Sequence, residues 1–251
     1  MVVMYIKRYI FHVHTEYSQD SDMRIEKIYK KLKKNNIDGI AITDHNSIKG
    51  AIKFKEKYGK EIDVVIGEEI MTTNGEIIGL FLEEEIPKGL SPMETIKRIK
   101  EQDGIVYIPH PFDDKRKKTC LDEKFINELQ DNIDVIEVFN GRCIQNSYNE
   151  KADCLARELN KRGIVGSDAH SYYEVQFNYV EFRNKITRNN ILEELKHFKI
   201  LQKRNNKIIH YYTMYIKIKK LIKDGKLDEA FNFIYRGCKK RFKAFRKVYR
   251  K

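Results

Sequence analysis

The sequence predicts an α/β domain built on a mainly parallel β-sheet, either open or closed into a barrel. Short apolar, β-branched runs alternate with segments whose apolar residues recur at helical spacing. Repeated strand–helix units are typical of parallel sheets, because each helix returns the chain to the same sheet edge. Hydrophobic residues make up 41% of the 251 residues, which is enough for one large core and argues against disorder.

Seven segments are predicted as strands from their apolar, β-branched content. The third and fourth follow one another almost directly, so one hairpin-like step is expected to interrupt the alternation. In sheets of this kind ligands bind at the carboxyl ends of the strands. The predicted strands are 9–13, 39–43, 64–67, 77–82, 105–108, 135–139 and 164–166.

Helical patterns lie between most of these strands. Ser91, followed by Pro92 and then Glu94, predicts a helix start, because serine caps free backbone N–H groups and proline suits the first turn. The apolar residues at helical spacing are Ile25, Ile28, Tyr29 and Leu32, then Ile96 and Ile99, then Phe125, Ile126 and Leu129, and finally Ala152, Leu155, Ala156 and Leu159.

The net charge of +12 is concentrated after residue 200. Residues 201–251 contain 17 Lys+Arg and 3 Asp+Glu, a balance of +14, which leaves 32 basic and 34 acidic residues, a balance of −2, in residues 1–200. We therefore expect an α/β domain at 1–200 and a basic helical extension at 201–251. Residues 227–251 have the pattern of a basic amphipathic helix. Its aromatic face either packs on the barrel or contacts nucleic acid or an anionic lipid surface.

No transmembrane segment is expected, since no run approaches 18 apolar residues. Residues 1–10 lack the features of a signal peptide and are better interpreted as leading into a first strand, so a cytoplasmic location is expected. The four cysteines form no C-x-x-C pair and are expected to be reduced thiols.

Five of the seven histidines stand at the carboxyl ends of predicted strands, which scattered core histidines would not do. His12 and His14 are two residues apart on the first strand. Alternate residues of a strand point to one face, so both imidazoles are expected to aim the same way and to bind one metal ion. The five histidines are His12, His14, His45, His110 and His170.

Carboxylates cluster near the same strand ends. Imidazole and carboxylate ligands together favour Zn, Mn or Fe over the all-oxygen sites of Ca or Mg. More than eight ligand-type groups exceed what one ion needs, so two or three divalent metal ions are expected. The acidic candidates are Asp20, Asp44, Glu69, Glu76 and Asp168.

Taken in order, these motifs resemble the PHP superfamily, named for polymerase and histidinol phosphatase. The resemblance covers roughly residues 9–185 and implies a distorted (β/α)7 barrel with metal-dependent phosphoesterase activity. Each motif is short, but the ordered set is specific. The motifs are His12-Val13-His14-Thr15, Ser18-x-Asp20, Thr43-Asp44-His45, Gly67-x-Glu69, His110-Pro111 and Gly166-Ser167-Asp168-Ala169-His170.

The resemblance also implies how the ligands are grouped. Many relatives have a histidine where this chain has Glu76, so Glu76 is expected either to be a carboxylate ligand or to leave the second ion with a weaker contact. Asp20 is a histidine in some relatives, which bears on metal preference. The implied groups are His12, His14, Glu69 and Asp168 for one ion, Glu69 with His110 for a second, and Asp20, His45 and His170 for a third.

The expected reaction is hydrolysis of a phosphoester, in which a metal-bound hydroxide attacks phosphorus in line. Asp44, His45 and Asp168 are the candidates for proton transfer, and the sequence does not choose between them. The expected substrate is a phosphorylated small molecule or a nucleotide. The alternative hypothesis is a nuclease that uses the basic extension. A third hypothesis is a non-catalytic barrel, and the nearly complete ligand set argues against it.

Two residues after the sixth strand are candidates for substrate binding. Arg142 is expected either to clamp a phosphate bidentately or to be a solvated loop arginine. Asn140, together with Glu137 on the strand before it, is expected either to contact substrate or ligands or to make plain structural hydrogen bonds.

Overall fold

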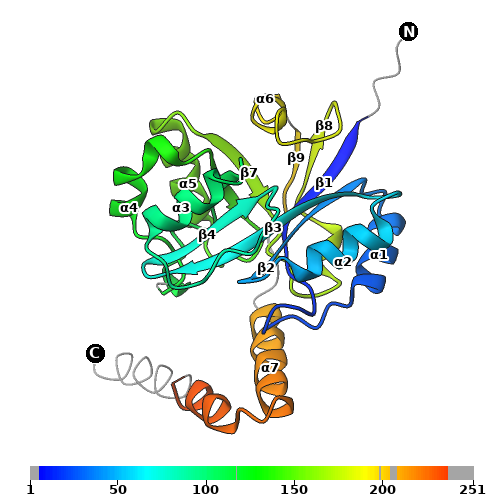
Figure 1. Ribbon diagram of the computed structural model, residues 1–251, viewed down its shortest axis with the longest axis vertical. Helices are drawn as coiled ribbons and strands as arrows, with labels where there is room; N and C mark the ends of the chain where they lie inside the picture. The colour runs from blue at the N-terminus through cyan, green and yellow to red at the C-terminus, as the bar shows by residue number, and fades with distance from the viewer. Residues whose placement is uncertain (1–5, 117, 198, 204–207, 237–251) are drawn as a thin grey trace.

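The computed structural model describes residues 6–116, 118–197, 199–203 and 208–236. A nine-stranded sheet with the order β7-β6-β5-β4-β3-β2-β1-β8-β9 forms the centre of the molecule (Figure 1). All seven predicted strands are present, and the sequence reasoning missed β8 and β9. The strands are β1 (Lys7–Val13), β2 (Gly39–His45), β3 (Asp63–Thr72), β4 (Gly75–Leu80), β5 (Ile105–Ile108), β6 (Val135–Asn140), β7 (Arg162–Gly166), β8 (Tyr179–Phe182) and β9 (Lys199–Leu201).

The sheet curls until the end of β7 meets β1, which confirms the distorted barrel. Ser167 N–H donates to the Phe11 carbonyl at 2.9 Å, and Ala169 N–H donates to the His12 carbonyl at 3.1 Å. His14 N–H donates in return to the Ala169 carbonyl at 2.9 Å. β8 pairs antiparallel with the opposite end of β1, so it fills the gap that the two strands leave there.

β4 is the strand that departs from the parallel arrangement of the predicted set. It pairs antiparallel with β3 and with β5, whereas β1–β2, β2–β3, β5–β6 and β6–β7 are parallel. The expected hairpin step is therefore confirmed. Because β4 runs the other way, its amino end lies at the edge where its neighbours have their carboxyl ends.

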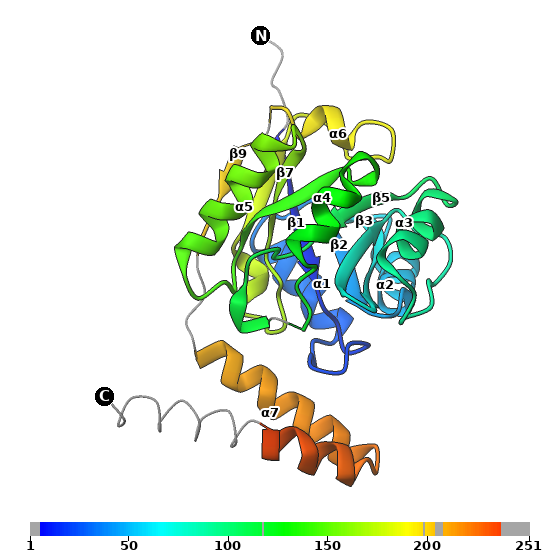
Figure 2. The same cartoon turned by 90° about the vertical axis from the view of Figure 1, so that its left-hand side faces the viewer.

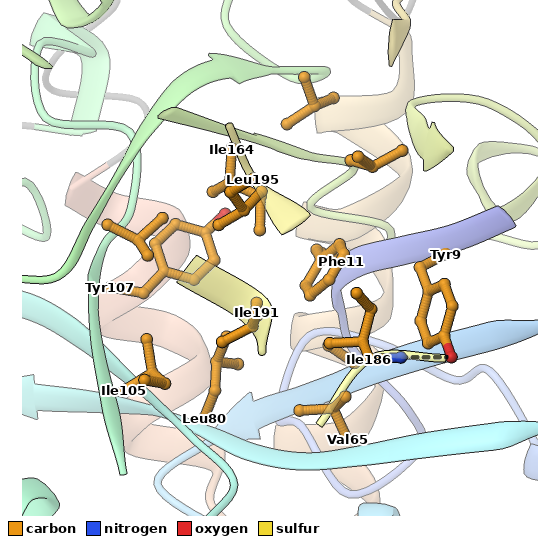
Figure 3. Packing of buried hydrophobic residues seen from close by; sticks show 14 of the residues in the cluster. Tyr9, Phe11, Val65, Leu80, Ile105, Tyr107, Ile164, Ile186, Ile191 and Leu195 are labelled. Atoms are coloured by element: carbon orange, nitrogen blue, oxygen red, sulfur yellow. Dashed lines mark hydrogen bonds between the residues drawn. The ribbon is translucent and has the colours of Figure 1, made fainter. Parts of the chain in front are cut away.

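Alternate strand residues fill the barrel interior, as a period of two requires. Tyr9 and Phe11 of β1 pack there with Tyr107 of β5 (Figure 3). Ile10 belongs instead to the cluster that packs with the helices outside. At the amino end the Tyr9 hydroxyl accepts a hydrogen bond from Ile186 N–H at 3.1 Å. Ile191 of α6 belongs to the same cluster, so the segment around α6 closes the barrel end where the strands begin.

Helices cover the outside of the sheet. Ile28 and Leu32 of α1 are buried at the predicted helical spacing, and Ser91 caps α3 by accepting from Glu94 N–H at 3.2 Å. The helices on the barrel are α1 (Ile25–Lys34), α2 (Lys49–Tyr58), α3 (Pro92–Lys100), α4 (Glu123–Glu128), α5 (Asn146–Glu158) and α6 (Ile191–Glu194), with short 3₁₀ turns at Asp114–Arg116, Gln130–Asn132 and Glu174–Gln176.

The extension begins as a helix below the barrel. α7 (Ile208–Lys223) lies beyond the carboxyl ends of the strands, and a turn at 224–226 leads into a second helical segment, 227–236, which folds back (Figure 2). The rest of the predicted helix 227–251, from residue 237 on, lies outside the described residues, as do residues 1–5 of the expected lead into the first strand. In the described part of the chain no helix is long and apolar enough to cross a membrane. Cys120, Cys143 and Cys154 are free thiols.

Candidate metal centre

The predicted ligands converge at one edge of the barrel. Glu76 joins them because it opens the antiparallel β4, and Asp20 reaches them from the loop between β1 and α1. Of the other side chains, those within strands are His12, His45 and Glu69, in β1, β2 and β3. Those that follow β1, β5 and β7 by one to four residues are His14, His110, Asp168 and His170. The nine side chains are His12, His14, Asp20, His45, Glu69, Glu76, His110, Asp168 and His170, and each lies within 4.0 Å of at least one other.

Glu69 stands at the centre of this cluster and faces four imidazoles. Its Oε1 lies 3.2 Å from His12 Nε2 and 3.1 Å from His110 Nε2. Its Oε2 lies 3.3 Å from His14 Nε2 and 3.1 Å from His45 Nδ1. A carboxylate shared between two pairs of imidazoles is placed to bridge two cations.

Asp168 and Asp20 occupy two other sides of the cluster. Asp168 Oδ1 lies 3.8 Å from Nε2 of both His12 and His14. Asp20 lies 3.5 Å from His45 Nε2 with one oxygen and 3.4 Å from His170 Nε2 with the other. These contacts bring together the residues of two of the three implied ligand groups, whose binding of metal stays a prediction.

Glu76 lies beside the residues of the remaining group. Its oxygens lie 3.5 Å from His45 Nδ1 and 3.7 Å from His110 Nε2, and its side chain is nearly fully buried. A ligand role for Glu76 stays a prediction.

A bulge in β1 is what brings His12 and His14 to the same pocket. The register between β1 and β2 shifts after Ile10, and His12 has a φ of 59°. Simple alternation would turn His12 away from Phe11, which faces the barrel interior. The extra residue turns Val13 outward, so both imidazoles reach the pocket although the strand is irregular.

Several ligand atoms are buried without a hydrogen-bond partner. They are Nε2 of His12, Nε2 of His14 and Oδ1 of Asp168, together with Oδ1 of Asp20. Native structures rarely leave buried polar atoms unpaired, because the desolvation is not compensated. Imidazole nitrogens and carboxylate oxygens aimed at a common space are the donor set of a divalent metal site, so the residues fit such ions.

Glu137 supports the cluster from behind. It accepts from His110 N–H at 2.7 Å and from Asn140 Nδ2 at 2.8 Å, and it also bonds the Tyr107 hydroxyl. A β-carbon on Gly166 would lie 1.6 Å from its Oε1, so glycine is needed there. Asn140 also donates to Asp168 Oδ2 at 3.1 Å, which places this buried amide behind the ligands; a direct contact between Asn140 and substrate stays a prediction.

Asp44 is not one of the nine side chains of the cluster. Its two oxygens accept from Thr15 N–H and Thr15 Oγ1, both at 2.6 Å, and from Ser18 Oγ at 2.7 Å. Ser18 in turn lies 3.0 Å from His14 Nδ1. The contacts of Asp44 are those of a residue that orients Ser18 and His14, and its suggested part in proton transfer stays a prediction.

The guanidinium of Arg142 already bonds other protein groups, whereas the predicted phosphate clamp needs it to be available to substrate. Its Nε lies 3.1 Å from Glu174 Oε1, and Nη2 donates to the Ile209 carbonyl at 3.3 Å and to Thr213. It lines the cavity, but these bonds tie its guanidinium to α7. It is therefore not a solvated loop arginine, and its binding of substrate stays a prediction.

Arg116 is the functional candidate that sequence reasoning missed. Its Nη1 lies 2.5 Å from Asp168 Oδ2 and its Nε lies 3.3 Å from Asp113, while Nη2 is buried without a partner. The only feature of the sequence that points to Arg116 is its place in a basic run at 115–118, shortly after His110-Pro111. Such a run is more often a solvated loop, and only the fold shows that this one returns to the metal ligands.

A cavity of about 1010 Å³ opens beside the cluster. Its wall on the barrel side contains ligand residues, and its opposite wall is formed by the extension. The barrel residues that line it include Asp20, His45, Glu76 and His170, together with Arg116 and Arg142. The residues of the extension that line it are His210, Thr213, Met214, Lys217 and Phe233.

Comparison with known proteins decides the family. The model of the PHP domain family matches residues 11–248, nearly the whole chain and well past residue 200. The chain belongs to the PHP domain family. Uncharacterized protein MJ1587 of Methanocaldococcus jannaschii is 48% identical over 141 residues, 51% of this chain and 79% of that protein. Uncharacterized protein MJ0417 of the same organism is 37% identical over 175 residues, 68% of each.

A solved structure shows the same fold. A two-domain protein from Bacteroides vulgatus, described as containing a "predicted PHP-like metal-dependent phosphoesterase", superposes with a TM-score of 0.67 at 16% identity. The likeness covers 79% of this chain and 65% of that one. The distorted barrel is thus the fold of this PHP domain, and it carries a buried His/Glu/Asp cluster suited to divalent metals.

The charged groups of the PHP-domain cluster shift one another's pKa values. Burial lowers the pKa of His12, but the nearby Glu69, Glu137 and Asp168 outweigh it and raise the pKa to about 10. Burial and the charge of Glu69 raise the pKa of Glu76 to about 7. Each shift has the direction that a concentrated negative field produces, and such a field attracts cations.

Proposed function

We propose that this PHP domain hydrolyses phosphoesters with two or three divalent metal ions. The observation that carries the proposal is the convergence of nine imidazole and carboxylate side chains beside a cavity, several with buried, unpaired ligand atoms. A decayed, non-catalytic barrel would have lost some of them, and each of the nine is present in the cluster.

The contacts support three ligand groups, two of which share Glu69. His12, His14 and Asp168 would hold one ion with it, and Glu76 and His110 would hold a second. The third group is Asp20, His45 and His170. The mixture of nitrogen and oxygen donors favours Mn, Zn or Fe.

Bound ions would supply a nucleophilic hydroxide near neutral pH and neutralise charge on the phosphoryl oxygens. The chain itself would add Arg116, which lines the cavity and pairs with Asp168. Its buried Nη2 has no hydrogen-bond partner and would be available to donate to a phosphoryl oxygen. Among the three proton-transfer candidates His45 lines the cavity. In the form with two ions, in which no third ion is bound by its imidazole, we assign to it the exchange of a proton with the leaving group or solvent.

The substrate we propose is a phosphorylated small molecule or a nucleotide. The cavity offers cations at Arg116 and Lys217 and apolar surface at Met214 and Phe233. Cations suit phosphate groups, and apolar surface suits the organic part of such a molecule.

The test combines metal analysis with a hydrolysis screen in added Mn²⁺. We expect about two or more ions per chain, as the donor set requires, and release of phosphate from a phosphomonoester, phosphodiester or nucleotide. His14→Ala and Asp168→Ala should abolish it, whereas His197→Ala, which removes a histidine outside the cluster, should not. Bound metal without turnover on any of the three substrate classes would instead favour a binding module.

A further inference from the structure

The C-terminal hairpin, residues 208–236, exposes an unusual share of the molecule's apolar surface. Thirteen large hydrophobic side chains are exposed in the described residues, and ten of them lie between 208 and 235. Phe231 is 69% exposed and Tyr235 56%, and their rings stack with an angle of 12° between planes. The aromatic face of the second helical segment therefore does not pack on the barrel.

Basic side chains lie among these exposed aromatics. The hairpin contains six Lys+Arg and three Asp+Glu. On α7 the exposed Lys219 lies one helical turn from Tyr215 and one from Ile222, in the same stripe. A helix that lies on a membrane separates its apolar face from its charges, whereas this stripe mixes them.

The hairpin is fixed to the loop that carries a metal ligand. Lys220 Nζ donates to the carbonyls of Glu16 and Ser18 at 2.6 and 2.7 Å. Ser18 is two residues before Asp20 in the chain. The Tyr212 hydroxyl donates to Asp22 Oδ1 at 3.0 Å. The position of the hairpin relative to the metal ligands is thus set by direct bonds.

The surface of the hairpin continues into the metal-ligand cavity. Lys217 and Phe233 line the cavity, and the Lys217 ammonium lies 5.3 Å from the centre of the Phe233 ring. A chain of phosphates that crosses the hairpin would meet this pair and then the ligands Asp20 and His170. A polymer can therefore contact both parts at once.

We propose that the C-terminal hairpin binds single-stranded nucleic acid and leads its phosphodiester backbone to the metal centre. The proposal rests on the phosphoesterase function and adds a phosphodiester polymer to the small phosphoesters proposed as its substrates. Exposed aromatic rings stack on unpaired bases, and lysines neutralise phosphates. A second copy of the chain would bring two basic surfaces together, which their charges oppose.

Binding is measured on the full-length protein with fluorescein-labelled oligo-dT in EDTA, so that no metal-dependent hydrolysis interferes. We expect an anisotropy rise that weakens steeply with added KCl and is smaller for the matching duplex. Phe231→Ala with Tyr235→Ala should weaken binding about tenfold or more, because two stacking rings are lost. Tyr173→Ala, which removes an exposed tyrosine of the barrel, is the matched control and should bind as the unaltered protein does.

Three results would overturn the proposal. The first is no oligonucleotide binding at low salt. The second is binding that the double variant leaves intact. The third is sedimentation with phosphatidylserine vesicles, or self-association, in the absence of oligonucleotide binding, which would make a membrane or a second copy the occupant. Hydrolysis of small phosphoesters by the same preparation is scored separately, so failure of the proposed function is told apart from failure of the docking surface.

Discussion

Oε1 of Glu137 lies 2.9 Å from Nδ1 of His12, and this contact turns the other ring nitrogen toward Glu69. A carboxylate behind a metal-binding histidine fixes its tautomer and raises its basicity. We expect Glu137→Gln to weaken metal binding by about 10–100-fold. Competition with a chromophoric chelator for Zn²⁺ measures this, with Glu181→Gln, at the β1–β8 pair, as the control. Equal affinity in Glu137→Gln and the unaltered protein would show that His12 is held by other contacts.

The two arginines beside the cluster should differ in their effect on catalysis. Arg116→Ala should lower kcat/KM about 10–100-fold, because a charged hydrogen bond to the phosphoryl group is lost. It should also lower the free energy of unfolding, because the buried Asp113 and Asp168 lose their ion pairs with it. Arg142→Ala breaks the buried ion pair with Glu174, so it should lower the free energy of unfolding while the folded variant keeps most of its kcat/KM. Steady-state kinetics on folded protein and urea unfolding separate the two effects, and a loss of kcat/KM in Arg142→Ala as large as that in Arg116→Ala would return the phosphate clamp to Arg142.

Asp44 gives a direct test between a positioning and a catalytic role. Three donors from Thr15 and Ser18 bond to its carboxylate, so Asp44→Asn should lower the free energy of unfolding by about 1–3 kcal/mol. Activity should fall only as far as His14 loses its orientation. The pH profile of kcat is the deciding measurement, since loss of one ionisation limb without loss of stability would make Asp44 the proton-transfer residue.

The ligand cluster was predictable because strand ends in a parallel sheet meet at one edge. Seven of the predicted ligands, all but Asp20 and Glu76, needed only that rule and the residue types. Glu76 needed one further fact, the antiparallel direction of β4, which the short spacing after β3 had indicated. The bulge at His12 could not be predicted from the sequence, since nothing in residues 9–14 distinguishes a regular strand from one with an extra residue.

What loops and surfaces do was much less predictable. Arg116 and Arg142 both follow strands, and their different partners depend on how the loop and α7 pack. β8 and β9 are strands of four and three residues, too short for an alternating pattern to stand out. Periodicity shows that a helix has two faces but not which one is buried, so the sequence left open whether the aromatic face of the hairpin packs on the barrel.

Metal removal should lower the thermal stability of the protein. Asp20, Glu69, Glu76 and Asp168 are close together, and ions bound only by the folded state stabilise it by about 2.7 kcal/mol at a hundredfold excess over Kd. We expect EDTA to lower the melting temperature and Mn²⁺ or Zn²⁺ to restore it. In a protein with His14→Ala and Asp168→Ala the metal-dependent shift should be smaller, because the ion of that group is lost. A full shift in that variant would place the ions elsewhere.

His210 should make the docking of α7 sensitive to acid. Its Nε2 lies 3.0 Å from the Arg142 carbonyl, and burial, followed by the charges of Arg142 and Arg116, lowers its pKa to about 4. The folded pKa is below the ordinary value near 6.5, so the unfolded chain binds the proton more tightly. The stabilisation is therefore present above about pH 6.5 and is lost as pH falls through about 4.

Thermal unfolding of the unaltered protein and of His210→Gln between neutral and acid pH measures this contribution. The variant has no imidazole to protonate, so the advantage of the unaltered protein should be largest at neutral pH and should shrink as the pH falls. His197→Gln, in a histidine outside the hairpin, controls for the general effect of acid. A difference between the two melting temperatures that does not change with pH would mean that protonation of His210 is not coupled to the docking of α7.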